Sequence, residues 1–123
     1  MRSFHSLRIV CLMAVVLACG CASNNKGKIE GTKWSSDRAT IKGNFIPAGT
    51  LFLDFRKDGT LAGYADRVQL SGTYSLGWGD IVTLHFNQSL WNQKNYTESI
   101  VIKKDSMTMT DPDGLKLTFR KVN

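Results

Sequence analysis

Three stretches between Gly49 and Phe86 alternate apolar and polar residues with a period of two. Successive side chains of a strand point to opposite faces of a sheet, so each stretch predicts a strand with one buried face. Between the stretches, 57–59 (KDG) and 77–80 (GWGD) hold residues that tolerate a positive φ, as tight reversals require. The pattern predicts an antiparallel β-meander. Its apolar positions are Leu51, Leu53 and Phe55, then Val68, Leu70 and Tyr74, then Val82, Leu84 and Phe86.

The chain beyond residue 30 continues this pattern in shorter pieces. A weak strand over 39–45 is interrupted by Gly43, and the turn signals near the C-terminus favour short antiparallel strands. About eight short strands and no helix are expected, which places the chain in the all-β class as a small up-and-down meander or barrel. The later strands are predicted over 96–103, 107–110 and 115–120, and the turns at 104–106 (KDS) and 111–114 (DPDG).

One face of these strands is expected to form a single small core. The residues expected to point inward are Leu51, Leu53, Phe55, Leu70, Tyr74, Val82, Leu84, Phe86, Ile100, Ile102, Leu117 and Phe119.

The polar segment 87–95 (NQSLWNQKN) shows no alternation and is predicted to be the longest loop. Within it, Leu90 and Trp91 are expected to fold back over one end of the barrel. Together with Trp78 in the GWGD turn, they are the candidate contacts for a ligand or a partner, because aromatic side chains at a rim suit binding surfaces. The same residues could equally cap the barrel ends.

The N-terminus has the organisation of a secretory signal peptide. Residues 1–8 carry Arg2 and Arg8, and residues 9–18 (IVCLMAVVLA) are an uninterrupted apolar run of ten. This run matches a signal-peptide core but is too short to cross a bilayer core of about 30 Å as a helix. We therefore assign residues 1–18 as a leader.

The cysteines beside this run indicate how the leader is processed. Residues 16–21 (VLACGC) resemble the lipobox of bacterial lipoproteins, and either Cys19 or Cys21 fits as the acylated residue, with Cys19 in the more typical flank. Two or more acyl chains would anchor the mature protein to a membrane. The resemblance implies the outer membrane, facing the periplasm, because Gly20 or Ala22 follows the cysteine and neither is the aspartate of an inner-membrane retention signal. The alternative is ordinary cleavage near Ala22 and a released protein.

Residues 19–30 are expected to be a lipidated N-terminus and a polar, flexible tether, and residues 31–123 the folded domain. Without Arg2 and Arg8 the chain has 14 basic and 10 acidic side chains. The basic residues are scattered over turns and strands, so no nucleic acid partner is expected. The domain has no cysteine, so it can form neither a disulfide nor a thiolate metal site.

The sequence offers no constellation for catalysis. His85 is the domain's one histidine, it lies on the pleat face opposite Leu84 and Phe86, and no second ligand or base accompanies it. The DPDG segment lacks the further oxygen ligands of a calcium loop and is interpreted as a turn. We expect no enzyme activity, no metal and no cofactor.

The order of motifs resembles that of small bacterial lipocalin-like domains over about Gly31 to Val122. The elements that carry the resemblance are Gly31 and Trp34, the KDGT and SGTY segments, a Gly-Asp turn, the DPDG turn and a final LTFRKV. Two residues rather than one separate Gly31 from Trp34, and the C-terminal helix of that family is missing. The resemblance implies a closed barrel with a ligand cavity, and a contact of Arg120 with the face of Trp34.

These observations predict a lipid-anchored, non-enzymatic barrel of the cell envelope that binds a small apolar ligand or a protein partner. The alternatives are a structural envelope lipoprotein without a pocket and an envelope hydrolase or an inhibitor of such an enzyme. An open apolar cavity inside the barrel would favour a binder, whereas a filled interior would favour a structural role.

Overall fold

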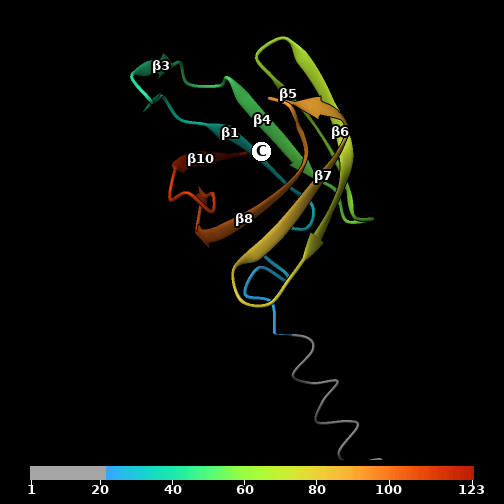
Figure 1. The fold of residues 1–123 in the computed structure, drawn as a ribbon. Coiled ribbons are helices and arrows are strands. Elements are labelled where there is room, and N and C mark those ends of the chain that lie inside the picture. Colours follow the sequence, from blue (N-terminus) through green and yellow to red (C-terminus); the bar gives the residue numbers. More distant parts are fainter. Residues whose placement is uncertain (1–21) are drawn as a thin grey trace, which may run out of the picture.

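The computed structural model describes residues 22–123, which form an all-β domain (Figure 1). Within these residues no helix is long and apolar enough to cross a membrane. The strands are β1 (Thr32–Ser36), β2 (Ala39–Ile41), β3 (Asn44–Ile46), β4 (Leu51–Phe55), β5 (Thr60–Ala65), β6 (Val68–Leu76), β7 (Ile81–Leu90), β8 (Gln93–Lys103), β9 (Ser106–Thr110) and β10 (Lys116–Val122).

Eight of the strands close into an antiparallel up-and-down barrel, which confirms the predicted fold class. The order around the barrel is β1-β10-β9-β8-β7-β6-β5-β4, so strands adjacent in the chain are also neighbours in the sheet. Closure depends on β1, which pairs with β10 on one side and β4 on the other; Trp34 lies opposite Lys121 and Leu53. Closure leaves the sheet without exposed edge strands.

The segment 39–45, which we expected to be one interrupted strand, is a separate hairpin of β2 and β3 outside the barrel. Lys42 and Gly43 at its tip have φ angles of 51° and 80°, which both central residues of a type I′ turn require. Gly43 therefore reverses the chain rather than merely weakening a strand.

The predicted loop over 87–95 is wrong. β7 continues to Leu90, β8 begins at Gln93, and Trp91 and Asn92 alone form the turn, with φ angles of 51° and 66°. The β7–β8 register also shifts between His85 and Leu90, as at a bulge. The polar sequence hid this hairpin because the pairing depends on backbone hydrogen bonds and not on an apolar face. The turns predicted at 57–59, 77–80, 104–106 and 111–114 are confirmed.

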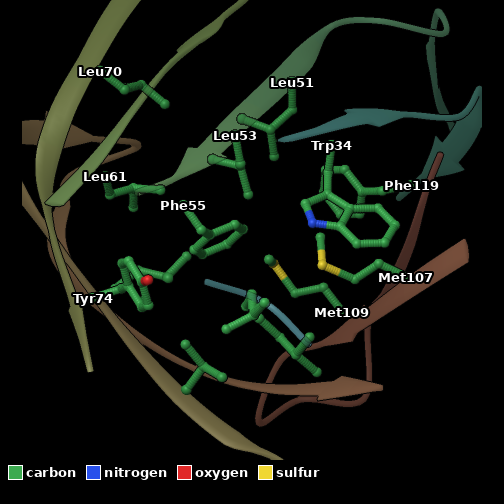
Figure 2. Packing of buried hydrophobic residues seen from close by; sticks show 14 of the residues in the cluster. Trp34, Leu51, Leu53, Phe55, Leu61, Leu70, Tyr74, Met107, Met109 and Phe119 are labelled. Atoms are coloured by element: carbon green, nitrogen blue, oxygen red, sulfur yellow. The ribbon is translucent and has the colours of Figure 1, made fainter. Parts of the chain in front are cut away.

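Large apolar side chains fill much of the interior. Of the twelve residues expected inside, ten are buried, and Ile102 and Leu117 are half-buried against the others. Figure 2 shows Trp34, Phe119 and Met107 grouped on one side of the core and Leu61, Leu70 and Tyr74 along another wall. Val68, which the alternation also placed on the apolar face, is exposed because it lies at the first position of β6, at the rim.

Two glycines allow the sheet to bend sharply around this core. A Cβ built on Gly63 would lie 1.9 Å from the carbonyl oxygen of Phe52, and one on Gly72 would lie 1.9 Å from that of His85. Neighbouring strands thus approach each other too closely for any side chain at these positions, in β5 and β6. Glycine at such points is a usual way to curve a sheet into a barrel.

The two ends of the barrel differ. One end, here called the closed end, carries residues 22–31 and the turns at 56–60 and 77–80: Asn24 donates its N–H to the carbonyl of Gly79 (2.9 Å), and Gly31 donates to that of Phe55 (2.7 Å). The other, the open end, carries the β2–β3 hairpin and the turns at 66–67, 91–92 and 111–114. In Figure 1 the hairpin lies at the upper left and the blue N-terminal segment at the bottom of the barrel.

The segment expected to be a flexible tether is in part integrated into the barrel. Ile29 is wholly buried and belongs to the core. The buried amide of Asn25 donates to the carbonyl oxygens of Ile100 (3.0 Å) and Asp80 (3.3 Å). The polar sequence predicted a tether because one aliphatic residue among seven polar ones gives no periodic signal. The first described residues instead cover the closed end.

The predicted contact of Arg120 with Trp34 is wrong. Trp34 is wholly buried and donates its Nε1–H to the hydroxyl of Thr32 (2.8 Å), so its ring faces need no cover from solvent. The Arg120 side chain is 83% exposed and pairs with Asp37 (3.3 Å). Phe119 points inward, and adjacent residues of a strand alternate, so Arg120 must point outward.

Candidate functional site

A cavity of about 690 Å³ opens at the open end of the barrel. This volume lies within the range of about 300 to 1,000 Å³ that is usual for small-molecule sites. The hairpin β2–β3, the turn at Trp91 and the turn at 111–113 surround its mouth. Its walls are largely apolar and include Leu51, Leu53, Leu84, Phe86, Leu90, Met109, Leu115 and Leu117.

The cavity exists because the bulkiest interior side chains occupy other parts of the barrel. Trp34, Phe55 and Phe119 are the largest wholly buried residues, and none of them lines the cavity. The edge of Phe55 packs against Tyr74 with a centroid distance of 5.1 Å, and the hydroxyl of Tyr74 donates to the carbonyl of Arg56 (2.6 Å). The interior is therefore filled toward the closed end and left open toward the other.

Glu98 is the one charged residue buried among the described residues, and it lies on the cavity wall. It follows Tyr96 and precedes Ile100 on the inward face of β8, and only 6% of its surface is exposed. Within residues 22–123 no hydrogen bond or ion pair joins its carboxylate to another side chain or to the backbone. Every side-chain nitrogen or oxygen atom of these residues that is fully enclosed has a hydrogen-bond partner, so the carboxylate oxygens of Glu98 are not fully enclosed. The carboxylate oxygens therefore reach the space of the cavity.

The surroundings of Glu98 favour its protonated form. Removal from water raises its pKa to about 7, and the negative charge of Asp111 adds to the shift. Burial also raises the pKa of Tyr96, with a smaller contribution from Glu98. Tyr96 is held in place by an edge-on contact with Phe86, at a centroid distance of 5.8 Å, and by a hydrogen bond from its hydroxyl to the carbonyl of Leu90.

The charges around the cavity are mostly negative. Three acidic residues line it, Glu98 on the wall and Asp111 and Asp113 at the mouth, against a single basic residue, Lys42 at the tip of the hairpin. The carboxylate of Asp111 accepts the backbone N–H groups of Asp113 (2.9 Å) and Leu115 (2.8 Å), which fixes the turn. This balance is opposite to that of the whole chain, whose formal charge is +6.

The stability of the protein should fall as the pH rises through the titration of Glu98. Its pKa is raised from 4.5 to about 7 on folding, so between these values the folded chain keeps a proton that the unfolded chain has lost. The contribution of Glu98 to the free energy of unfolding is therefore fully present below about pH 4.5 and is lost as the pH rises to about 7 and above. We expect a loss of about 1 to 2 kcal/mol from this group, less than the roughly 3 kcal/mol of the full shift, because the cavity admits water.

Urea unfolding at pH 5 and pH 8 measures this effect, with Glu98→Gln as the control. The variant should lose less stability than the wild type over this interval. An equal loss in both proteins would show that Glu98 is not the group responsible.

The candidate contacts named from the sequence divide between the two ends. Leu90 and Trp91 line the cavity, with Leu90 buried and Trp91 67% exposed. Trp78 is 73% exposed but lies in the β6–β7 turn at the closed end, next to residues 22–24. The structure therefore brings Leu90 and Trp91 together and leaves Trp78 apart from them. Cys19 and Cys21, the candidate acylation sites, lie outside the described residues.

His85 is exposed on the outside of the barrel, where it forms a hydrogen bond with the side chain of Asn95. Among residues 22–123 no group of three histidine, cysteine, aspartate or glutamate side chains could hold a metal ion.

A second, shallower depression of about 370 Å³ lies on the outer face of β4, β5 and β6, where the rings of Phe52 and Tyr64 stack with a centroid distance of 5.3 Å. Gly63 is one of the residues that line this depression, and its lining is more polar than that of the cavity at the open end.

Sequence reasoning missed Glu98, although the signal was present. With Ile100 and Ile102 assigned to the inward face of 96–103, alternation places Glu98 on the same face. A carboxylate at such a position is unusual enough to mark a site.

Comparison with protein-family models and with curated proteins finds no match to this chain.

Proposed function

We propose that this chain is a non-enzymatic, lipid-anchored lipoprotein of the bacterial cell envelope, with a lipocalin-like barrel that binds a small apolar ligand. The observation that carries the proposal is the open, apolar-walled cavity of about 690 Å³ at one end of an eight-stranded barrel. A barrel of eight strands is just wide enough to hold one small ligand, as lipocalins do.

The position of the N-terminus fits an anchored binder. Residues 22–31 cover the closed end, so a lipid at Cys19 or Cys21 would attach close to that end. The mouth of the cavity would then face away from the membrane, toward the periplasm if the anchor lies in the outer membrane. Ligand could enter without displacing the anchor. Mass spectrometry of the mature N-terminus tests the acylation.

A protein partner at the rim is the second candidate function. It is favoured by the exposed Trp91 beside the cavity mouth, because exposed aromatic residues are common at interfaces. The two functions make different demands on the interior. Only ligand binding requires the cavity to stay open.

Binding of an apolar probe tests the ligand hypothesis. The full chain with Cys19→Ser and Cys21→Ser, secreted and purified without detergent, should bind the fluorescent probe N-phenyl-1-naphthylamine. Leu117→Trp, which fills the cavity from β10, should weaken binding by about tenfold or more, or roughly 1.4 kcal/mol. The control Val101→Trp adds the same ring on the outer face of β8 and should bind as the parent does. Equal affinity of the two variants would refute an interior site.

A further inference from the structure

We propose that the cavity selects an apolar molecule that carries a protonated amine, for which Glu98 is the counter-ion. The inference rests on the proposed ligand-binding function and adds the polar group that such a ligand must present. It follows from one carboxylate, its surroundings and the space beside it.

Glu98 is more than nine-tenths buried as a residue, and its carboxylate reaches the cavity without a hydrogen-bond or ion-pair partner among residues 22–123. A buried charge without a partner is strongly unfavourable, and a cation brought by a ligand would remove that penalty. The free-energy cost of burying Glu98 in a largely apolar wall is therefore recovered when a cationic group occupies the cavity. A neutral apolar ligand would leave the Glu98 carboxylate without a partner.

The other charges that face Glu98 support a cation and oppose an anion. Glu98 and Asp111 come directly beyond the last β8–β9 pair, Ser99 with Thr110, and the charge of Asp111 acts on Glu98; Asp113 lies in the same turn as Asp111. The neighbouring strands β7 and β9 contribute Leu84 and Met109 to the wall, neither of which titrates. On β8 itself Tyr96 is the nearest ionisable group, and its raised pKa keeps it neutral at ordinary pH. Lys42, at the exposed hairpin tip, is the only cation of the lining.

The apolar walls distinguish an organic amine from a simple metal ion. A divalent cation requires several oxygen ligands. Among residues 22–123 no group of three carboxylate, histidine or cysteine side chains could hold one, and much of the remaining wall is leucine, phenylalanine and methionine. An alkyl chain with a terminal ammonium group would use both features. Its chain would contact the walls and its N–H groups would donate to the carboxylate in charge-assisted hydrogen bonds.

The test compares three probes of equal chain length in the secreted Cys19→Ser/Cys21→Ser chain: decylamine, decanol and decanoate. Each competes with the fluorescent probe at pH 8, where Glu98 is ionised. We expect decylamine to bind about tenfold more tightly than decanol, and decanoate to bind more weakly than decanol. At pH 5, where Glu98 is protonated, the preference for the amine should shrink.

Glu98→Gln should abolish the preference of the cavity for decylamine over decanol, and its far-UV circular dichroism should match that of the parent, which shows that the variant is folded. Asp105→Asn, which removes a carboxylate in the β8–β9 turn at the closed end, is the matched control and should keep the preference. Equal binding of decylamine and decanol by the parent, or an unchanged preference in Glu98→Gln, would overturn the inference while leaving the ligand-binding function standing. Binding of none of the three probes, nor of the dye, would overturn both.

Discussion

Trp34→Ala should lower the free energy of unfolding by about 3 to 5 kcal/mol, a large share of the total stability of a domain this small. Trp34 is wholly buried at the centre of β1, the strand that closes the barrel by pairing with both β4 and β10. Its removal leaves a cavity beside Phe119 and also deprives Thr32 of the indole N–H. The loss therefore affects the seam of the barrel, where no other strand can compensate.

The other two tryptophans provide the controls for this prediction. Trp78→Ala and Trp91→Ala remove the same ring from positions that are 73% and 67% exposed, so each should cost less than about 1 kcal/mol. Urea unfolding followed by far-UV circular dichroism compares all three variants without relying on tryptophan fluorescence. A midpoint for Trp34→Ala that matches either control would mean that the barrel does not close around this residue.

The alternation of apolar residues was sufficient to predict the fold class and most of the core. Leu84 and Phe86, for example, were placed inside because the period of a strand is two, and both are buried. This signal is local and survives in a single sequence. Applied to the last strand as well, the same alternation would have excluded the predicted Arg120–Trp34 contact. Phe119 points inward, so Arg120 at the next position points outward and cannot cover Trp34.

The features that sequence did not reveal depend on contacts between distant segments. The β7–β8 hairpin is formed by backbone pairing across Trp91 and Asn92, in a stretch whose side chains are mostly polar. The cavity depends on which large residues meet inside the closed barrel. That arrangement follows from the pairing of β1 with β4 and β10 and not from any one stretch. Glu98 is intermediate, because its position was predictable but its apolar surroundings were not.

Ile29→Ala should lower the free energy of unfolding by about 2 to 4 kcal/mol, although Ile29 precedes the first strand of the barrel. Its side chain is wholly buried in the core. Its backbone is held as well: its N–H donates to the carbonyl of Asn25 (3.1 Å), and its own carbonyl accepts the N–H of Thr32 (3.1 Å). The truncated side chain would leave a void that this fixed backbone cannot close by moving inward.

The adjacent Lys28 is exposed, so Lys28→Ala should change the free energy of unfolding by less than about 0.5 kcal/mol and serves as the control. Urea midpoints measure both variants, and hydrogen exchange locates the effect. The Gly31 amide, which donates to Phe55, should exchange faster in Ile29→Ala before the barrel unfolds. Equal midpoints for the two variants would restore the flexible-tether interpretation of residues 23–30. A selective loss in Ile29→Ala would mean instead that the closed end is built by the N-terminal segment, which fixes any N-terminal anchor at the end opposite the cavity mouth.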